Sequence, residues 1–298
     1  MDEASDGQAD GPAHDLVRDL HDDAARDPNL AVASVRPLGT TAFEIRLIGR
    51  DALRKLDVDR NTSVLEVGCG VGALGLPVAR RASRYVGIDI AETALAVFAR
   101  RLAEAGLGER RASLRALDFV AAPAETIESL GQFDRVLAYA VLHYVGSESE
   151  GQAFVVRAIA ALKPGGKALF GNLPLFELAA EAQPHAALPA GSLRRIAAIV
   201  RGTLDRGTPN AVGVVQSRRA RLANLGFGRA RLWLRPVVKG ARTAPTSLPS
   251  GATLQLSSQV IERWLDEAPI PVRYRWLPPG AATPLATGRA DLLVTRES

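Results

Sequence analysis

The chain has 298 residues, 47% hydrophobic and 23% charged, with a formal net charge of +5 at pH 7. This composition is typical of a globular protein and excludes a fibrous or wholly disordered one. No uncharged apolar run reaches the roughly eighteen residues of a membrane span, and the N-terminus lacks the pattern of a secretory signal. The single cysteine, Cys69, cannot form an internal disulfide. We therefore expect a cytoplasmic protein without a membrane association.

The first sixty residues are expected to precede the main domain. Residues 1–12 are acidic and almost devoid of apolar side chains, which predicts a disordered tail. Residues 13–60 are expected to form a helical segment with one helix from Pro12 to about Asp27 and another over 43–56. One face of the first helix should carry the apolar side chains Leu16, Val17 and Leu20.

Strands and helices alternate over residues 61–174, the predicted core. The expected strands are 63–67, 85–90, 113–116, 133–138 and 167–172. The expected helices between them are 74–82, 93–105 and 151–162, the last one ending at a Lys-Pro-Gly-Gly turn. Such alternation implies right-handed crossovers, so we predict an α/β fold with a doubly wound, mostly parallel sheet.

The alternation breaks after Pro174. Residues 175–257 hold twelve Arg or Lys against three acidic residues, and we interpret them as a basic insertion after strand five. A helix at 192–204, a helix–strand stretch at 216–234 and a loop at 239–251 are expected inside it. Residues 258–298 should complete a seven-stranded sheet through a helix at 258–267 and an antiparallel hairpin of strands 272–277 and 290–295.

Glycines follow the first strand directly, in Val67-Gly68-Cys69-Gly70-Val71-Gly72. Glycines after a buried strand let the backbone turn sharply and approach a ligand closely. They also lead into a helix N-terminus, which favours negative or polar ligand atoms. By itself the pattern stays ambiguous, because Gly70, Gly72 and Gly75 also fit the G-x-G-x-x-G of dinucleotide-binding folds. A structural turn without a ligand is the other interpretation.

Four further motifs accompany the glycines in chain order. They are Asp89 at the end of the second strand, Asp118 after the third, Phe133–His143 over the fourth and Leu162–Gly166 before the fifth. Together with Glu66–Gly72, these motifs resemble the class I S-adenosylmethionine-dependent methyltransferases. The resemblance covers about residues 60–174 and weakly 258–298. It implies a Rossmann-like fold, an enzyme that transfers methyl groups, and S-adenosyl-L-methionine as the cofactor.

The resemblance also implies which residues bind that cofactor. Asp89 would accept hydrogen bonds from the ribose hydroxyls, and Asp118 would reach the adenine amino group, unless it is a helix cap. Glu66 is expected to order the glycine turn, and Tyr139 to contact the methionine part. Cys69 has no partner that would activate it as a nucleophile. The implied set is Glu66, Gly68, Cys69, Gly70, Gly72, Asp89, Ile90, Leu117, Asp118, Phe119, Ala138 and Tyr139.

His143 is the candidate general base, because histidine ordinarily titrates near working pH and this one follows the fourth strand. A structural or cofactor-adjacent role is the alternative, and Tyr144 is a further candidate for the acceptor site. The four histidines are scattered and Cys69 stands alone, so no metal site is expected.

We predict methyl transfer to a small-molecule acceptor, first of all to a hydroxyl of a specialised metabolite or a sugar. Transfer to nitrogen, carbon or RNA is the alternative within the class, although scarce lysine and a missing Asn/Asp-Pro-Pro-aromatic pattern disfavour nucleic acid. An NAD(P)-dependent oxidoreductase and a non-catalytic adenosylmethionine-binding regulator are the alternatives outside it. No oligomeric state is predicted.

The basic insertion is expected to act as a lid or to recognise the acceptor, and it would suit an anionic one. A solvated helical face with scattered arginines is the alternative. The arginines in question are Arg194, Arg195, Arg218, Arg219, Arg221, Arg229, Arg231 and Arg235.

Overall fold

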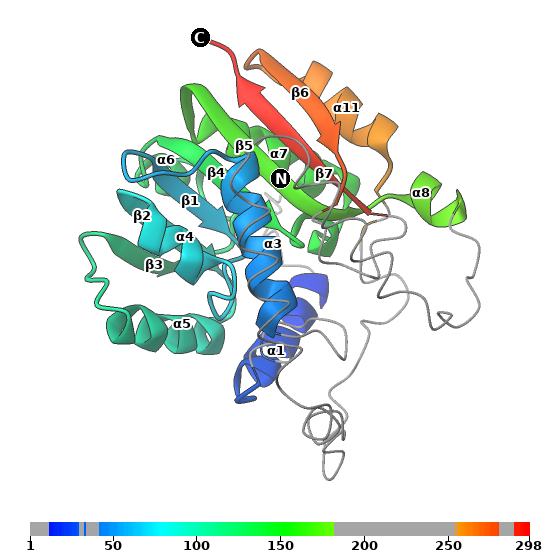
Figure 1. Cartoon of the computed structure of the whole chain (residues 1–298). Coiled ribbons are helices and arrows are strands. Elements are labelled where there is room, and N and C mark those ends of the chain that lie inside the picture. Colours follow the sequence, from blue (N-terminus) through cyan, green and yellow to red (C-terminus); the bar gives the residue numbers. More distant parts are fainter. Residues whose placement is uncertain (1–11, 30–32, 34–41, 182–253, 255, 280–288) are drawn as a thin grey trace, which may run out of the picture. The chain divides into compact units, whose positions relative to one another are not determined.

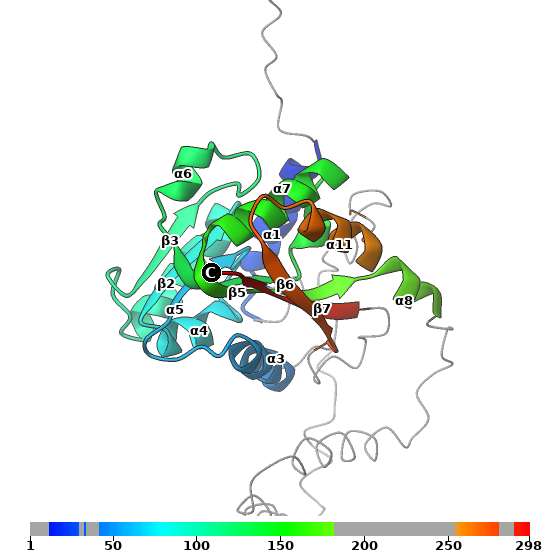
Figure 2. The ribbon, with the colours of Figure 1, turned by 90° about the horizontal axis from the view of Figure 1, so that it is seen from above.

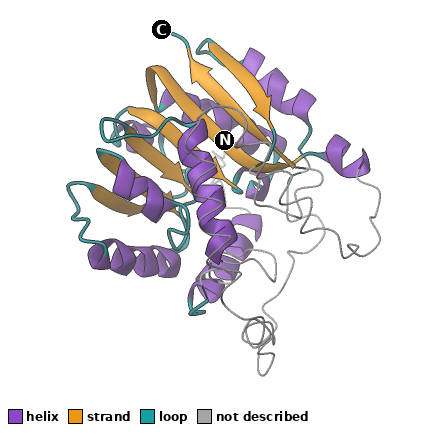
Figure 3. Cartoon of the chain, in the orientation of Figure 1, coloured by secondary structure: helices purple, strands orange, loops and turns teal. Residues whose placement is uncertain are grey.

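The strands of the computed structural model form one sheet (Figures 1 and 3). The model describes residues 12–29, 33, 42–181, 254, 256–279 and 289–298. The strands are β1 (Ser63–Val67), β2 (Arg84–Asp89), β3 (Ala112–Ala116), β4 (Phe133–Tyr139), β5 (Leu162–Pro174), β6 (Val272–Leu277) and β7 (Arg289–Arg296).

The sheet has seven strands in the order β3-β2-β1-β4-β5-β7-β6. Neighbouring strands from β3 to β5 pair in parallel, and β7 runs antiparallel to both β5 and β6. All five residues of β1 are buried, as expected of a parallel strand covered on both faces. The predicted doubly wound sheet with an antiparallel C-terminal hairpin is confirmed.

Helices cover both faces of this sheet. α3 (Ala42–Lys55), α4 (Gly75–Arg81) and α5 (Glu92–Glu104) lie on one face, and α6 (Ala124–Glu128), α7 (Glu148–Ala160) and α11 (Ser258–Asp266) on the other (Figure 2). The first face buries a cluster that includes Ile48, Phe98 and Leu293, and the second one that includes Phe154 and Trp264. The other helical elements are α1 (Pro12–Ala25), the 3-10 helix η1 (Leu142–Tyr144) and α8 (Phe176–Glu181).

Side-chain caps begin the two long helices of the second face. The Ser147 hydroxyl accepts a hydrogen bond from the Glu150 amide at 3.2 Å, so α7 begins three residues before the predicted start. Ser257 caps α11 in the same way, and Ile261, Trp264 and Leu265 of that helix are buried. A Cβ on Gly151 would lie 2.6 Å from the Trp264 ring, so the two helices pack closely there.

Strand β5 differs from its prediction. The sequence predicts a turn at Lys163–Gly166 and a strand only at 167–172, whereas β5 covers Leu162–Pro174. Its pairing with β4 shifts from Phe133↔Leu162 to Arg135↔Lys167, so the turn survives as a bulge inside the strand. The short elements α6, η1 and α8 escape prediction, because none has more than six residues and so none shows a readable period.

The buried face of α1 does not include every apolar side chain that the sequence places on its apolar face. Val17 is buried, whereas Leu16 is 39% exposed. The face that turns inward continues from Val17 to Ala24 and Ala25, which are buried.

All the described residues belong to one compact unit, Met1–Gln183 with Pro245–Ser298. The expected tail before Pro12 and the elements expected at 192–204, 216–234 and 239–251 lie outside the described residues. The insertion over 175–257 therefore stays a prediction. Within the described ranges, no helix combines the length and the hydropathy needed to cross a bilayer.

Candidate active site

The glycine turn forms an open corner at the carboxyl end of β1. Gly68, Gly70 and Gly72 have φ angles of 71°, 50° and 73°, a region that favours glycine. The Gly68 amide donates to the Ile88 carbonyl at 2.8 Å, which ties the turn to β2. A Cβ on Gly72 would lie 2.1 Å from the Phe98 ring, whereas one on Gly70 would meet no atom within 4 Å. Gly70 therefore faces open space, as the wall of a ligand site must.

Asp89 lies beside that corner, at the end of β2. Its Oδ2 accepts a hydrogen bond from the Gly70 amide at 2.7 Å, and its Oδ1 accepts one from the Ala91 amide at 2.9 Å. The residue is 9% exposed. A carboxylate can accept about four hydrogen bonds. The Gly70 and Ala91 amides thus fix the orientation of the Asp89 carboxylate, which can still accept two more hydrogen bonds from ligand hydroxyls.

The side chains beneath the corner support it from the interior. The buried Tyr85 hydroxyl donates to Glu66 Oε2 at 2.7 Å, and a Cβ on Gly75 would lie within 3 Å of both groups. Burial, followed by the nearby charges of Asp89 and Glu66, raises the pKa of the Cys69 thiol well above its usual value. The thiol is therefore neutral and not a nucleophile.

A cavity of about 550 Å³ begins at Ile90, the residue after Asp89, although neither Asp89 nor a glycine of the turn lines it. This volume is in the range of small-molecule sites. Ile90, Leu117 and Asp118, three of the residues expected around the adenosyl group, line it, whereas Phe119 is buried in the core against Phe154. The complete lining of the cavity is His14, Asp15, Arg18, Asp22, Ile90, Glu92, Thr93, Ala116, Leu117 and Asp118.

Asp118 has local partners in this structure. Its Oδ1 accepts hydrogen bonds from the Val120 and Ala121 amides at 2.8 and 2.9 Å, the contacts of a turn cap. Its Oδ2 lies 2.8 Å from His14 Nδ1. An adenine amino group would therefore share Asp118 with His14 or replace it there.

Helix α1 supplies polar side chains to the site that the sequence analysis missed. His14, Arg18 and Asp22 line the cavity, and Asp22 accepts a hydrogen bond from the Thr93 amide at 2.8 Å. His14 also lies 3.3 Å from Glu150 through its Nε2. Their spacing of four residues places these side chains on one helical face. That spacing is the signal that could have revealed them.

The end of β4 brings a second group of expected residues to the same edge of the sheet. Ala138 and Tyr139 are 1% and 7% exposed, and Ala140 adopts a φ of 60°. His143 follows in η1, is 7% exposed, and has no hydrogen-bond partner on its Nδ1. Its ring centroid lies 4.2 Å from that of Tyr144.

A methyltransferase-domain family model matches residues 64–166, the segment that contains β1 to the start of β5. Residues 64–166 form a class I methyltransferase domain. Its sequence relatives include a ubiquinone biosynthesis O-methyltransferase of Methylobacterium nodulans, 36% identical over 122 residues, which are 41% of this chain and 44% of that protein. A 23S rRNA (uracil(1939)-C(5))-methyltransferase of Burkholderia thailandensis is 33% identical over 43% of this chain and 25% of that protein. The matches thus span less than half the length of these relatives.

Solved structures share the fold of the methyltransferase domain. Phosphoethanolamine N-methyltransferase 1 of Haemonchus contortus matches with a TM-score of 0.57 and 13% identity, over 96% of this chain and 49% of that one. The N-methyltransferase NodS of Bradyrhizobium japonicum matches with a TM-score of 0.52 and 14% identity, over 94% and 98% of the two chains.

His143 of the methyltransferase domain is a weak base. Burial, followed by the positive charges of Arg289 and His21, lowers its pKa to about 3. The imidazole is therefore neutral at physiological pH, but it has little tendency to hold a transferred proton. The general-base role stays a prediction, and the geometry favours a neutral hydrogen-bonding role for Nδ1.

This low pKa makes the stability of the domain depend on pH. Below about pH 6.5 the unfolded chain protonates His143 while the folded chain does not, so the free energy of unfolding should fall as the pH falls from 6.5 toward 3. His143→Gln removes one proton from the difference between the unfolded and the folded state. We therefore expect the free energy of unfolding of this variant to change less steeply with pH, by about 1.4 kcal/mol per pH unit. Urea unfolding at several pH values between 4 and 7.5 measures it. An identical slope in both proteins would contradict a buried neutral imidazole.

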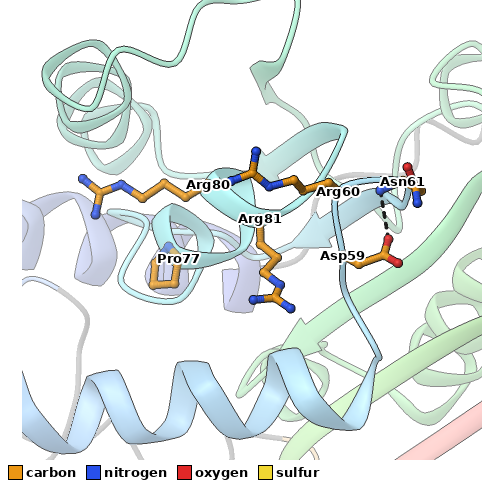
Figure 4. Close-up of a pocket in the computed structure, with 6 residues that line it drawn as sticks. All are labelled: Asp59, Arg60, Asn61, Pro77, Arg80 and Arg81. Carbon is orange, nitrogen blue, oxygen red and sulfur yellow. Dashed lines mark hydrogen bonds between the residues drawn. The ribbon is translucent and has the colours of Figure 1, made fainter.

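A second hollow of about 540 Å³ lies at the opposite edge of the sheet (Figure 4). It is lined by Asp59, Arg60 and Asn61, which precede β1, and by Pro77, Arg80 and Arg81 of α4. It contains none of the expected site residues, and the nearby C-terminus of α4 repels the anions that three arginines would attract. We assign it no role. Among the described residues, no group of three His, Cys, Asp or Glu side chains could hold a metal ion.

Proposed function

We propose that this protein transfers a methyl group from S-adenosyl-L-methionine to a small-molecule acceptor, with a hydroxyl as the reacting group. The observation that carries the proposal is Asp89, held by the Gly70 amide at 2.7 Å beside a glycine whose Cβ would point into open space. Such a corner fits an adenosyl ligand, because a backbone without side chains can approach the ligand while the carboxylate binds the ribose.

Each part of the cofactor has residues that would hold it. Asp89 would accept hydrogen bonds from both ribose hydroxyls. Ile90 and Leu117, which line the cavity, would contact the adenine, and Asp118 would accept a hydrogen bond from its amino group. Tyr139, at the end of β4, would contact the methionine part. Helix α1 would cover this ligand, since His14, Arg18 and Asp22 line the same cavity.

The residues of this chain would align the acceptor rather than activate the donor. When bound, S-adenosyl-L-methionine would supply an activated methyl group, whose bond to sulfur would break as its bond to the acceptor oxygen forms. Holding the two reactants in line can lower the activation barrier by several kcal/mol, because the entropy of bringing them together is lost on binding and not in the reaction step. The neutral His143 would accept a hydrogen bond from the acceptor hydroxyl on Nδ1, which has no other partner. The hydroxyl proton would then pass to solvent.

The relatives support oxygen as the reacting atom. The M. nodulans relative and several further ones are ubiquinone biosynthesis O-methyltransferases. The N-methyltransferases among the solved structures share the fold at 13–14% identity and carry no argument about the acceptor. The lone Cys69 favours a cytoplasmic enzyme.

Ligand-induced thermal stabilisation tests the cofactor, because a ligand that binds only the native state raises the melting temperature. We expect S-adenosylhomocysteine to raise it and NAD and NADP to leave it unchanged. Turnover is tested separately, with an isotopically labelled methyl donor and panels of hydroxylated and amino acceptors. Stabilisation by NAD alone would make the chain an oxidoreductase candidate. If only the amino acceptors become labelled, and no labelled ether or ester forms, the reacting atom is nitrogen and not oxygen.

A further inference from the structure

Arg289 lies at the edge of the sheet that carries the candidate active site. It begins β7 and stands opposite Pro174, the last residue of β5, in an antiparallel register. The start of β7 therefore lies at the same edge of the sheet as the carboxyl ends of the parallel strands. Arg289 thus shares this edge with Asp89, although it follows Asp89 by 200 positions in the sequence. The arginines that the sequence suggests for acceptor binding all belong to the insertion and lie outside the described residues.

The guanidinium of Arg289 is half-buried and has no acidic partner among the residues that the structure describes. Its Nη1 donates to the Asn172 carbonyl at 2.9 Å, and no carboxylate of the described residues forms an ion pair with it. A guanidinium has five N–H donors in a planar fork. Removing an unpaired cation from water costs free energy unless an opposite charge compensates it. Within the described part of the chain, the charge of Arg289 is therefore uncompensated.

Asn172 stands at the end of β5 in a strained conformation. Its φ is 58°, and its amide donates to the buried Asp291 carboxylate at 2.7 Å, which holds the residue in this conformation. Its side-chain Oδ1 is buried and has no hydrogen-bond partner. Ala140, at the end of the adjacent strand β4, has a φ of 60°. Left-handed backbone at residues other than glycine gathers at functional sites.

Aromatic and imidazole rings complete the surroundings of Arg289. The His143 and Tyr144 rings lie 4.2 Å apart, and the His21 and Tyr144 rings 5.8 Å. Arg289 is close enough to lower the pKa of His143, after burial, and burial lowers its own pKa while Tyr144 and Tyr139 raise it. Arg289 therefore lies within electrostatic range of the His143, Tyr144 and Tyr139 side chains. We call Arg289, Asn172, His143, Tyr144 and His21 the Arg289 cluster.

We propose that the Arg289 cluster binds the methyl acceptor, with the guanidinium of Arg289 pairing with a carboxylate of an aromatic acceptor. This inference rests on the proposed function and names the substrate class of the same site: a hydroxylated aromatic acid. The planar fork suits a carboxylate, which it can bind through two parallel hydrogen bonds. The orphaned Asn172 Oδ1 and His143 Nδ1 would bind polar groups of the same molecule.

The test uses benzoate and its uncharged isostere benzamide as probes, titrated by calorimetry into the protein saturated with S-adenosylhomocysteine. The wild type should bind benzoate about 10- to 100-fold more tightly than benzamide, the range expected for charge-assisted hydrogen bonds. Arg289→Gln should abolish this preference without weakening benzamide binding. Arg289→Lys should retain part of it. Arg275→Gln, on the neighbouring strand β6 and exposed, is the matched control and should bind like the wild type.

Three outcomes overturn the inference: equal affinity for both probes, no binding of benzoate at its solubility limit, or a preference that survives in Arg289→Gln. Thermal unfolding of each variant, and its affinity for S-adenosylhomocysteine, separate loss of the site from loss of the fold. Wild-type protein that fails to bind S-adenosylhomocysteine contradicts the proposed function itself. Protein that binds it but does not distinguish the probes contradicts only the acceptor class.

Discussion

Asp89→Asn should weaken the binding of S-adenosylhomocysteine by about 10²- to 10⁴-fold. Each hydrogen bond from a ribose hydroxyl to the carboxylate contributes about 1.5–3 kcal/mol. Two such bonds give about 3–6 kcal/mol, and each 1.4 kcal/mol is roughly a factor of ten in affinity. An amide has the shape of the carboxylate but lacks its charge and one accepting oxygen. Isothermal titration calorimetry at low and high salt measures the loss.

Asp89 also holds the glycine turn, so the loss of affinity must be separated from a disturbed fold. The Gly70 amide can still donate to the amide oxygen of the variant, but the Ala91 amide then loses its acceptor, so thermal unfolding of the variant must accompany the titration. Asp266→Asn, the same substitution at an exposed position of α11, is the matched control and should bind like the wild type. A loss below threefold in a normally folded Asp89→Asn would show that this carboxylate does not bind the ribose.

Lys55→Met should lower the free energy of unfolding by about 3–5 kcal/mol, the usual cost of leaving a buried charge without its partner. Lys55 Nζ lies 2.5 Å from Asp291 Oδ2 and 2.7 Å from Asp51 Oδ2. The Asp291 side chain is wholly buried, and burial raises its pKa while Lys55 lowers it. Urea unfolding at pH 7 measures the change. Because the Asp291 carboxylate binds the Asn172 amide, the same variant should also loosen the Arg289 cluster.

The chain offers an exposed pair of the same type for comparison. Lys163 pairs with Asp134 at 3.0 Å, but the two side chains are 46% and 27% exposed, so Lys163→Met should cost less than about 1 kcal/mol. The double variant Lys55→Met/Asp291→Leu should recover part of the loss, since it removes the buried carboxylate. The recovery should be incomplete, because the Asn172 amide loses its acceptor and Asp51 loses Lys55. Equal destabilisation by Lys55→Met and Lys163→Met would refute a structural role for the buried pair.

The sequence predicts those parts of the fold and the site that depend on local pattern. The β1 run and its glycines are contiguous, and Asp89 follows at the end of the next strand, so one βαβ unit contains the residues of the glycine corner. The doubly wound, mostly parallel sheet follows as well, because right-handed crossovers leave few topologies for this alternation.

The residues that escape prediction are brought together only by tertiary structure. His14 meets Asp118 although 104 positions separate them, and Arg289 meets Asn172 across 117 positions. The pattern within α1 shows which side chains share a face, but not that this face covers the ends of β2 and β3. The low pKa of His143 likewise arises from burial and then from the charges of Arg289 and His21, which lie far away in the sequence, so it has no local signature.

The central claim is that the glycine corner and Asp89 hold an adenosyl ligand. A crystal structure of the protein grown with S-adenosylhomocysteine tests it most directly. We predict density for the ligand at Gly70, with both ribose hydroxyls within hydrogen-bonding distance of the Asp89 carboxylate. An empty corner, or the ligand bound elsewhere, such as in the hollow around Arg60 and Arg80, would contradict the claim.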